Sequence, residues 1–339
     1  MLQYTRYGIT TTSSVYGSAF LLNFFVLLLL YSASTLAEDK VRVAVLKFGT
    51  ANWELDVIKR HNLDRAEGFE LDVVKLAGKQ ATMVALQAGD VNIAITDWIW
   101  VSRQRGNNRP FTFVPYSTAA GALVVPRGSS IKSLSDLKGK RLGIAGGPVD
   151  KSWLLFRALA LRDLGTDLEQ VLTPVFAAPP LLSEQLKQGR IDAIINFWPY
   201  VARLETEGMT QLMTVQEVAN ALGINSKVPM IGYVFDQRWA AENREVVLGF
   251  LHAATNAKAI MKDSDQEWMQ LRPLMKATDE TTFKALRDGF RSGIPSHWGK
   301  KEQEDAGKLF AILSELGGER LVGGTTRLSE GTFWPEVVY

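Results

Sequence analysis

The sequence contains no cysteine. Among 339 residues this absence excludes a disulfide framework, a thiolate metal site and a lipid-modified cysteine at a processed N-terminus. Histidine is scarce, and none of His61, His252 and His297 has a partner at the spacing of metal ligands. The 38 Lys and Arg are mixed with 36 Asp and Glu along the chain, so the charge gives no argument for nucleic acid. We therefore expect no metal, no cofactor and no nucleic-acid partner.

The motifs of catalysis are missing as well. The sequence has no Gly-x-Ser-x-Gly motif, no phosphate loop and no His-Glu pair. Residues 143–147 read Gly-Ile-Ala-Gly-Gly, but the third glycine and the distant acidic residue of a dinucleotide-binding turn are not in register. We therefore expect a protein that binds a molecule and is not an enzyme.

An apolar run near the N-terminus, residues 19–31, is short. It spans about a dozen residues, whereas a helix that crosses a membrane needs roughly 20. Small residues at Thr35 and Ala37 fit a signal-peptidase site before Glu38. The sequence thus predicts that residues 1–37 are a signal peptide cleaved near Ala37/Glu38 and that the mature protein is exported, which in a bacterium means the periplasm. An uncleaved anchor is the alternative, because the segment before the run is long and carries few charges.

One stretch of the sequence repeats at an offset of about one hundred residues. Residues 85–101 align with residues 185–201, and both read as the end of a helix closed by glycine, a short apolar strand and a polar, aromatic tip. The same offset pairs Trp98 with Trp198 and Trp53 with Trp153. A β-α-β unit that occurs twice predicts two similar lobes that face each other across a ligand cleft.

Alternating strands and helices predict an α/β fold with mainly parallel sheets flanked by helices. Strands are expected at residues 41–45, 69–76, 91–95, 111–115, 121–126, 141–145, 171–176, 191–196 and 230–235. Helices are expected at 54–62, 81–88, 150–164, 181–188, 244–261, 267–276, 280–289 and 301–316. We assign residues 38–122 to the first part of lobe I, 123–229 to lobe II, and 230–339 to the return crossing, the completion of lobe I and C-terminal helices. Two crossings, near 121–126 and 228–235, would form a two-strand hinge.

Several stretches together resemble a known family. They are Ala85-Leu86-x-x-Gly89-Asp90-Val91, Ser133-Leu134-x-Asp136-Leu137-Lys138-Gly139-Lys140-Arg141 and Gln188-Gly189-Arg190-Ile191-Asp192-Ala193. Over residues 41–260 the sequence is similar to the solute-binding proteins of nitrate, taurine, alkanesulfonate and thiamine-pyrimidine ABC importers, the NMT1/THI5-like proteins with the type 2 periplasmic binding fold. The resemblance implies a monomer that holds a small solute between two lobes and delivers it to a membrane permease served by a separate ATPase subunit.

Candidate ligand-binding residues follow from the rule that ligands collect beyond the carboxyl ends of parallel strands. They are Thr50, Asn52, Trp53, Gln80, Thr96, Asp97, Trp98, Gly147, Asp150, Ser152, Trp153, Asn196, Phe197, Trp198, Tyr200 and Tyr233. Each has a plainer interpretation. The tryptophans could pack in the core, Asp150 could cap a helix, and Thr96, Asn196, Asn52 and Gln80 could bind loop backbone groups.

The charge of the ligand is inferred from Asp97. No basic residue adjoins it in sequence, and Lys47 and Lys151 are expected to be solvated. A carboxylate in a partly dehydrated cleft is costly without a positive partner, so the ligand is expected to supply one. With aromatic walls, this favours a nitrogenous heterocycle or an organic cation. The alternative ligand is an anion such as a sulfonate or nitrate.

Two other functions remain open. An enzyme of pyrimidine or quinone biosynthesis can have the same fold, although the pyrimidine-precursor enzymes rely on cysteines and histidines that this chain does not have, and both kinds are normally cytoplasmic. A binding module that presents its ligand to a sensor or an oxidoreductase, instead of a permease, would have the same sequence features.

Overall fold

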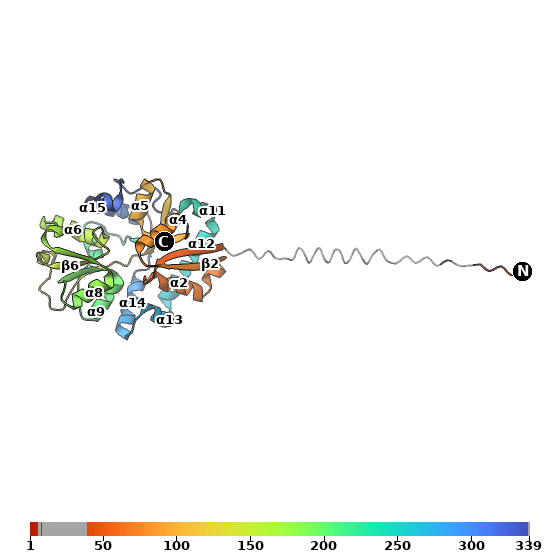
Figure 1. The fold of residues 1–339 in the computed structure, drawn as a ribbon, viewed down its shortest axis with the longest axis horizontal. Helices are drawn as coiled ribbons and strands as arrows, with labels where there is room; N and C mark the ends of the chain where they lie inside the picture. The colour runs from red at the N-terminus through yellow and green to blue at the C-terminus, as the bar shows by residue number, and fades with distance from the viewer. Residues whose placement is uncertain (6–7, 9–38, 338–339) are drawn as a thin grey trace. The chain divides into compact units, whose positions relative to one another are not determined.

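The computed structural model describes residues 1–5, 8 and 39–337 (Figure 1). The segment Met1–Glu38 is a unit separate from Asp39–Tyr339. The predicted signal peptide and its cleavage site fall mostly on residues outside this description and stay a prediction. Among the described residues, none of the helices combines the length and the apolar character that a membrane crossing requires.

The first sheet, with the helices on its two faces, is called lobe I below. Its strand order is β2-β1-β3-β10-β4. Strands β1, β2 and β3 are parallel, and β10 is antiparallel to both of its neighbours, β3 and β4. The strands are β1 (Asp39–Leu46), β2 (Phe69–Leu76), β3 (Ile93–Asp97), β4 (Phe111–Ser117) and β10 (Ile231–Asp236).

The second sheet, with its helices, is called lobe II. Its order is β7-β6-β8-β5-β9, with β5 antiparallel to its neighbours β8 and β9. The strands are β5 (Ala122–Val125), β6 (Arg141–Ala145), β7 (Thr173–Ala177), β8 (Ala193–Asn196) and β9 (Thr210–Thr214). The two sheets therefore have equivalent strand orders, with β7, β6, β8, β5 and β9 in the places of β2, β1, β3, β10 and β4. The predicted α/β fold of two lobes, each with a mainly parallel sheet, is confirmed.

The helices in the first two thirds of the chain follow their strands closely. They are α2 (Ala51–Arg60), α3 (Leu63–Ala66), α4 (Lys79–Ala88), α5 (Trp98–Gly106), the 3-10 turn η1 (Leu134–Leu137), α6 (Lys151–Leu164), α7 (Leu168–Val171), α8 (Pro179–Lys187), α9 (Trp198–Thr206) and α10 (Val215–Ala221). After β10 come α11 (Gln237–Glu242), α12 (Arg244–Asp263), α13 (Asp265–Met275), α14 (Glu280–Ser292) and α15 (Lys300–Val322).

The repeat seen in the sequence has a local structural meaning. Trp98 and Trp198 are the first residues of α5 and α9, and Trp53 and Trp153 are the third residues of α2 and α6. The expected polar, aromatic tips are therefore helix starts and not loops. Strand β9 was also missed, because its sequence Thr-Gln-Leu-Met-Thr has too few β-branched and aromatic residues to stand out.

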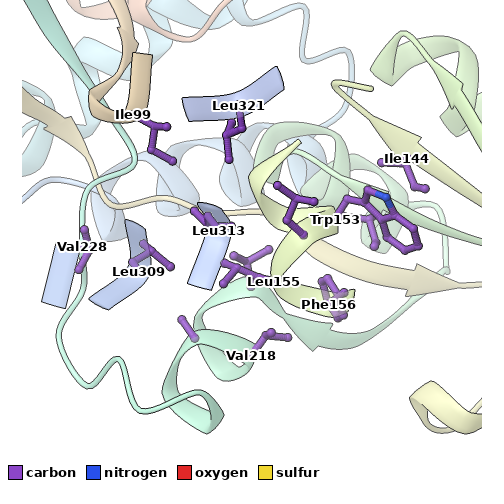
Figure 2. Close-up of a cluster of buried hydrophobic side chains, with 14 of the residues drawn as sticks. Ile99, Ile144, Trp153, Leu155, Phe156, Val218, Val228, Leu309, Leu313 and Leu321 are labelled. Atoms are coloured by element: carbon purple, nitrogen blue, oxygen red, sulfur yellow. The ribbon is translucent and has the colours of Figure 1, made fainter. Parts of the chain in front are cut away.

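Buried side chains cover both faces of each sheet. One core cluster contains Leu71 of β2 and residues of α2, α12, α13 and α14, while another lies between the second sheet and α8 and α9. The remaining cluster includes Ala94 of the first sheet and Leu142 of the second, joined through α5, α6 and α15. Figure 2 shows Leu313 of α15 close to Leu155 of α6, and Leu321 on the side of Ile99. One of the three hydrophobic clusters thus extends through both lobes.

Helix α15 is interrupted near its end. Gly318 has φ 51° and ψ −155°, a combination that only glycine adopts readily. Before the break, Gly317 lies against Leu154 of α6, and after it Gly323 lies against Arg103 of α5. The two parts of α15 therefore pack on different lobes.

Two crossings join the lobes at the carboxyl edges of their parallel strands. The chain leaves β4 at Ser117 and enters β5 at Ala122, and it returns from α10 to β10 between Ala221 and Ile231. In the first sheet, the strands attached to the crossings are β4 and β10, which lie at the opposite end from the edge strand β2. In the second sheet, the attached strand is β5, which lies away from the edge strand β7. The assigned boundaries at residues 122 and 229 lie near these crossings and stay a proposal.

Glycine at position 232 allows the central strand β10 to approach β4. A Cβ at this buried position would overlap the carbonyl oxygen of Val114 and the ring of Phe113. We expect Gly232→Ala to lower the free energy of unfolding by about 1–3 kcal/mol, the range for overpacked cores. Urea denaturation measures the change.

The matched control is Gly307→Ala in α15, where a Cβ meets open space. Alanine there should raise the free energy of unfolding by about 0.5–1 kcal/mol, because it favours the helix. Equal effects of the two substitutions would contradict the close approach of β10 to β4.

Candidate functional site

The carboxyl edges of the two sheets meet at Asp97, the last residue of β3. Lys79, the first residue of α4, and Lys151, the first residue of α6, both direct their ammonium groups at its carboxylate. Asp97 and Lys79 belong to lobe I and Lys151 to lobe II, so the cluster spans both lobes. We call the place where these three side chains meet the interlobe junction.

The hydrogen bonds of Asp97 are divided between its two oxygens. Oδ1 accepts from the backbone N–H of Trp100 at 2.9 Å, which caps the start of α5. Oδ2 accepts from Nζ of Lys151 at 2.8 Å and from Nζ of Lys79. The carboxylate side chain is 4% exposed, whereas the side chains of Lys151 and Lys79 are 20% and 48% exposed. Solvent and solutes therefore reach the lysines and not the acid.

The electrostatics of the junction follow from this pairing. Burial would raise the pKa of the Asp97 carboxyl, but the ammonium groups of Lys151 and Lys79 outweigh burial and hold its pKa well below the usual range. Burial would lower the pKa of Lys151, but Asp97 and Asp150 raise it. Asp150 itself has a raised pKa because its burial outweighs the attraction of Lys151. Asp97 and Lys151 thus remain an ion pair over the whole neutral range.

We expected the ligand to supply the positive charge beside Asp97, because no basic residue adjoins this acid in sequence. The premise that the protein provides no cation there was wrong. The protein supplies two cations from positions 18 residues before and 54 residues after the acid. Lys151 is part of an ion pair and is not simply solvated. The available sequence signal was that both lysines occupy the first turn after a strand, the position that points toward the same edge of a parallel sheet.

The structure buries most of the tryptophans that were candidates for ligand contact. Trp98 and Trp153 are fully buried, and the indole N–H of Trp98 donates to the carbonyl of Pro229 at 3.1 Å. Trp53 is buried against the edges of Trp198 and Trp268, with ring centroids 6.1 and 5.9 Å apart. Trp198 is partly exposed. These rings pack in or against the core, and their contact with a ligand stays a prediction.

Tyr233 belongs to a buried polar network in lobe I. Its hydroxyl donates to Glu54 of α2, and the ammonium group of Lys258 of α12 lies 2.7 Å from the same carboxylate and 2.9 Å from the Tyr233 hydroxyl. The Lys258 ammonium also stacks over the rings of Tyr116 and Tyr233. The network ties α2, which starts at the carboxyl end of β1, to the core of lobe I.

Two asparagines among the candidates hold local backbone. The amide of Asn52 donates to the carbonyls of Leu46 and Gly49 at 2.8 and 2.7 Å, which fixes the turn after β1. The amide of Asn196 donates to Pro179 and Ser183 at the start of α8. Both side chains are buried, so the plainer interpretation describes their contacts.

The other polar candidates lie at strand ends around the junction. Asp150 caps α6 by accepting from the N–H of Trp153 at 3.2 Å, as the plainer interpretation proposed. Thr96 is buried next to Asp97, and Gln80 is exposed beside Lys79. Thr50, Gly147 and Ser152 are partly exposed.

Exposed rings at the strand ends are phenylalanines. Phe197 follows β8 and is 39% exposed, and Tyr200 is partly exposed in the first turn of α9. Phe48 follows β1, is 70% exposed, and has the ammonium group of Lys276 4.6 Å from its ring centroid. Phe48 was not among the candidates, although the rule of strand ends includes it.

Several helices begin near the junction without a side-chain cap. Neither Thr50 of α2, Gly78 of α4 nor Phe197 of α9 provides a capping hydrogen bond from its side chain. Helix starts with uncapped N–H groups carry partial positive charge. At α2, however, the N–H groups of Asn52 and Trp53 donate to the carbonyls of Gly49 and Thr50, and at α9 Tyr200 donates to Phe197 while Pro199 has no N–H. The start of α4, together with Lys79 and Lys151, is therefore the part of these strand ends that attracts anions.

Two cavities of the described chain lie away from Asp97. One of about 230 Å³ lies beside the crossings and is lined by Thr118, Ser226, Lys227, Ser292, Ile294, Ser296, His297, Lys301 and Glu302. The other, of about 330 Å³, lies on lobe II and is lined by residues 126–131, Lys140, Gly189, Ile191 and Asp192. Within the residues that the structure describes, no three His, Asp or Glu side chains gather as a metal site would require.

The exposure of the rings predicts different effects of two substitutions. Trp98→Ala should lower the free energy of unfolding by about 3–5 kcal/mol, because it removes a fully buried ring. Phe197→Ala should lower it by less than about 1 kcal/mol, because the side chain already contacts solvent. Chemical denaturation of both variants tests this, and a larger loss for Phe197→Ala would contradict the packing.

The depressed pKa of Asp97 predicts how stability depends on pH. A carboxyl whose folded pKa lies below its unfolded value of 3.8 stabilises the fold above that value, and this stabilisation is lost as pH falls toward the folded pKa. Asp97→Asn keeps the capping oxygen but removes the charge. We expect a loss of about 2 kcal/mol that is constant from about pH 8 to about pH 5 and shrinks below about pH 4.

Urea denaturation at each pH measures this difference. Asp90→Asn, which changes an exposed carboxylate on the turn after α4, is the control and should have little effect at any pH. A loss for Asp97→Asn that grows as the pH falls below 4 would show that Asp97 is not held ionised.

Comparison with known proteins identifies the family. Residues 65–267 match the family model described as NMT1/THI5 like. The fold is similar to the periplasmic aliphatic sulphonate binding protein SsuA from Escherichia coli, with TM-score 0.70 and 18% identity over 87% of this chain and 92% of that one.

Other solved structures share this fold. The alkanesulfonate-binding protein SsuA from Xanthomonas axonopodis pv. citri bound to MOPS has TM-score 0.67 and 16% identity, over 87% of this chain and 98% of that one. The desulfurization enzyme DSZB has TM-score 0.57 and 14% identity, over 82% of this chain and 92% of that one. No curated protein matches the sequence. The family match extends over more than half of the chain and confirms the resemblance seen in the sequence: the chain belongs to the NMT1/THI5-like family.

Proposed function

We propose that this protein is the solute-binding component of an ABC importer, which holds a small molecule between its lobes and delivers it to a membrane permease. The observation that carries the proposal is the junction itself. Two sheets of the same strand order face each other through their carboxyl edges, and side chains of both lobes meet at Asp97. Ligands of open α/β sheets bind at such edges. Family membership and the fold shared with SsuA support the proposal.

The location follows from the same proposal. The predicted signal peptide in residues 1–37 would export the mature chain, and a permease receives solute from a binding protein on the outer side of the membrane. We propose a periplasmic monomer that functions with a permease and a separate ATPase subunit.

For the ligand we propose a small organic anion, with a sulfonate as the first class to test. Asp97 already has two cations, so the argument for a cationic ligand is removed. Lys79 and Lys151 remain partly exposed, and the start of α4 has no side-chain cap. These groups suit a negatively charged head, while Phe48 and Phe197 offer apolar surface to an alkyl chain. Two similar structures are described as sulfonate-binding proteins.

An enzyme on this fold is a weaker proposal. The fold does occur in the desulfurization enzyme DSZB. At the junction, however, Asp97 is fully engaged by two lysines and a backbone N–H, and Asp150 caps α6. A general base needs a proton acceptor that is free to reach the substrate, and both carboxylates are committed to internal partners.

Calorimetric titration tests the ligand class. The chain beginning at Glu38 should bind taurine or butanesulfonate more tightly than nitrate, and it should not bind choline. Lys79→Gln should weaken sulfonate binding roughly tenfold, because a hydrogen bond to a charged group contributes about 1.5–3 kcal/mol.

Lys262→Gln, which changes an exposed lysine at the end of α12, is the matched control and should leave the affinity unchanged. Binding of choline in preference to every sulfonate would return the organic cation to first place. Equal losses from Lys79→Gln and Lys262→Gln would show that the junction does not hold the anion.

A further inference from the structure

The bond between Asp97 and Lys151 is a direct ionic contact between the two lobes. Asp97 ends β3 of the first sheet, and Lys151 begins α6 behind β6 of the second, with 2.8 Å between Oδ2 and Nζ. Any opening of the lobes about the two crossings must break this bond. Lys79 is different, because it lies in the same lobe as Asp97.

We infer that Asp97 is a positioning residue that brings Lys79 and Lys151 together and holds the lobes closed even without ligand. The acid itself is 3% exposed, and its two oxygens are occupied by one backbone N–H and two ammonium groups. It therefore organises the groups that face solvent and does not need to touch a ligand. The role in closure concerns the protein alone, and the role in affinity rests on the proposed function.

Opening the junction leaves no buried charge without a partner. When Lys151 moves away, Asp97 keeps Lys79 and the N–H of Trp100 within its own lobe. Lys151 keeps the attraction of its neighbour Asp150, which contributes to its raised pKa. Breaking a buried ion pair is costly when one charged group is left without a partner. Here both Asp97 and Lys151 keep a partner in their own lobe. The bond can therefore form and break reversibly.

Other contacts between the lobes lack this property. Trp53 meets the edge of Trp198, Arg203 of α9 donates to the backbone carbonyls of Met275 and Lys276, and α15 packs on both α5 and α6. These contacts are apolar or bind neutral backbone groups. Compared with these contacts, the Asp97–Lys151 bond joins two charged groups, and it lies at the proposed anion site.

Distance measurements on the ligand-free protein test closure directly. The chain has no cysteine, so spin labels can be attached to Lys75→Cys on β2 and Thr173→Cys on β7 without first replacing any native cysteine. Both positions are exposed and lie on edge strands, on the far side of each sheet from the crossings. Hinge opening should lengthen this distance.

The expected result is a short interlobe distance in the parent chain and a larger population of long distances in Lys151→Gln and Asp97→Asn. Asn at position 97 retains a capping oxygen, so α5 should remain folded, and circular dichroism and thermal unfolding verify this. Lys151→Arg should restore the short distance, because it retains the charge. Lys79→Gln, within one lobe, should leave the short distance unchanged. Identical distance distributions in all five proteins would overturn the inference.

Ligand binding provides an independent readout. A protein that is closed only part of the time binds with an affinity reduced by that fraction. Asp97→Asn, at a buried residue that does not need to touch the ligand, should therefore lose roughly tenfold in affinity for a bound sulfonate. If no sulfonate binds to the parent chain, the proposed ligand class fails while the distance measurement still decides closure. If sulfonate binds and its affinity is the same in Asp97→Asn, the positioning role of Asp97 is wrong.

Discussion

A carboxylate at the end of a buried strand needs a positively charged partner. Asp97 has two, Lys79 of lobe I and Lys151 of lobe II, and this pairing brings the two lobes into contact. One oxygen starts α5, and the other holds the first residues of α4 and α6. Three helices from two sheets are thus oriented by a single side chain. Burial alone would favour the neutral acid, but the two ammonium groups together outweigh this cost. The junction consequently carries fixed charges where the strands of both sheets end.

The aromatic residues of the repeat serve folding first. Trp98 and Trp153 fill the core behind the strand ends, and Trp53 packs against Trp198 between the lobes. These rings begin helices at equivalent positions, but Trp98 is fully buried, whereas Trp198 is partly exposed and packs on Trp53 of the other lobe. The surface left at the strand ends is formed by lysines, uncapped helix starts and the partly exposed Phe48 and Phe197.

Local patterns predicted most of the fold, and long-range contacts limited the prediction of the site. Apolar runs such as Ile93–Asp97 and the hundred-residue repeat predicted the strands other than β9 and the division into two lobes. Helices α5 and α9 were missed entirely. Their first residues, Trp-Ile-Trp-Val and Trp-Pro-Tyr, are rich in types typical of strands and turns, although Pro199 in a first helical turn is a known signal.

The partners of Asp97 could not be found from the sequence around it. Lys151 is 54 residues away and reaches Asp97 only because the lobes face each other. The alternation of apolar residues also cannot distinguish a tryptophan that packs inward, such as Trp98, from one that lines a cleft, because both follow a strand. The burial of Trp53 and Trp98 results from tertiary packing, which the local sequence does not show.

The break at Gly318 bears on how such a molecule moves. A long rigid helix that packed on both lobes would act as a brace and oppose any rotation about the two crossings. Here the segment before the break lies on α6, and the segment after it lies on α5, where Arg103 donates to the carbonyl of Arg320. The break at Gly318 thus lies between a segment on α6 and a segment on α5, and a glycine break opposes a change of angle between them less than a continuous helix would.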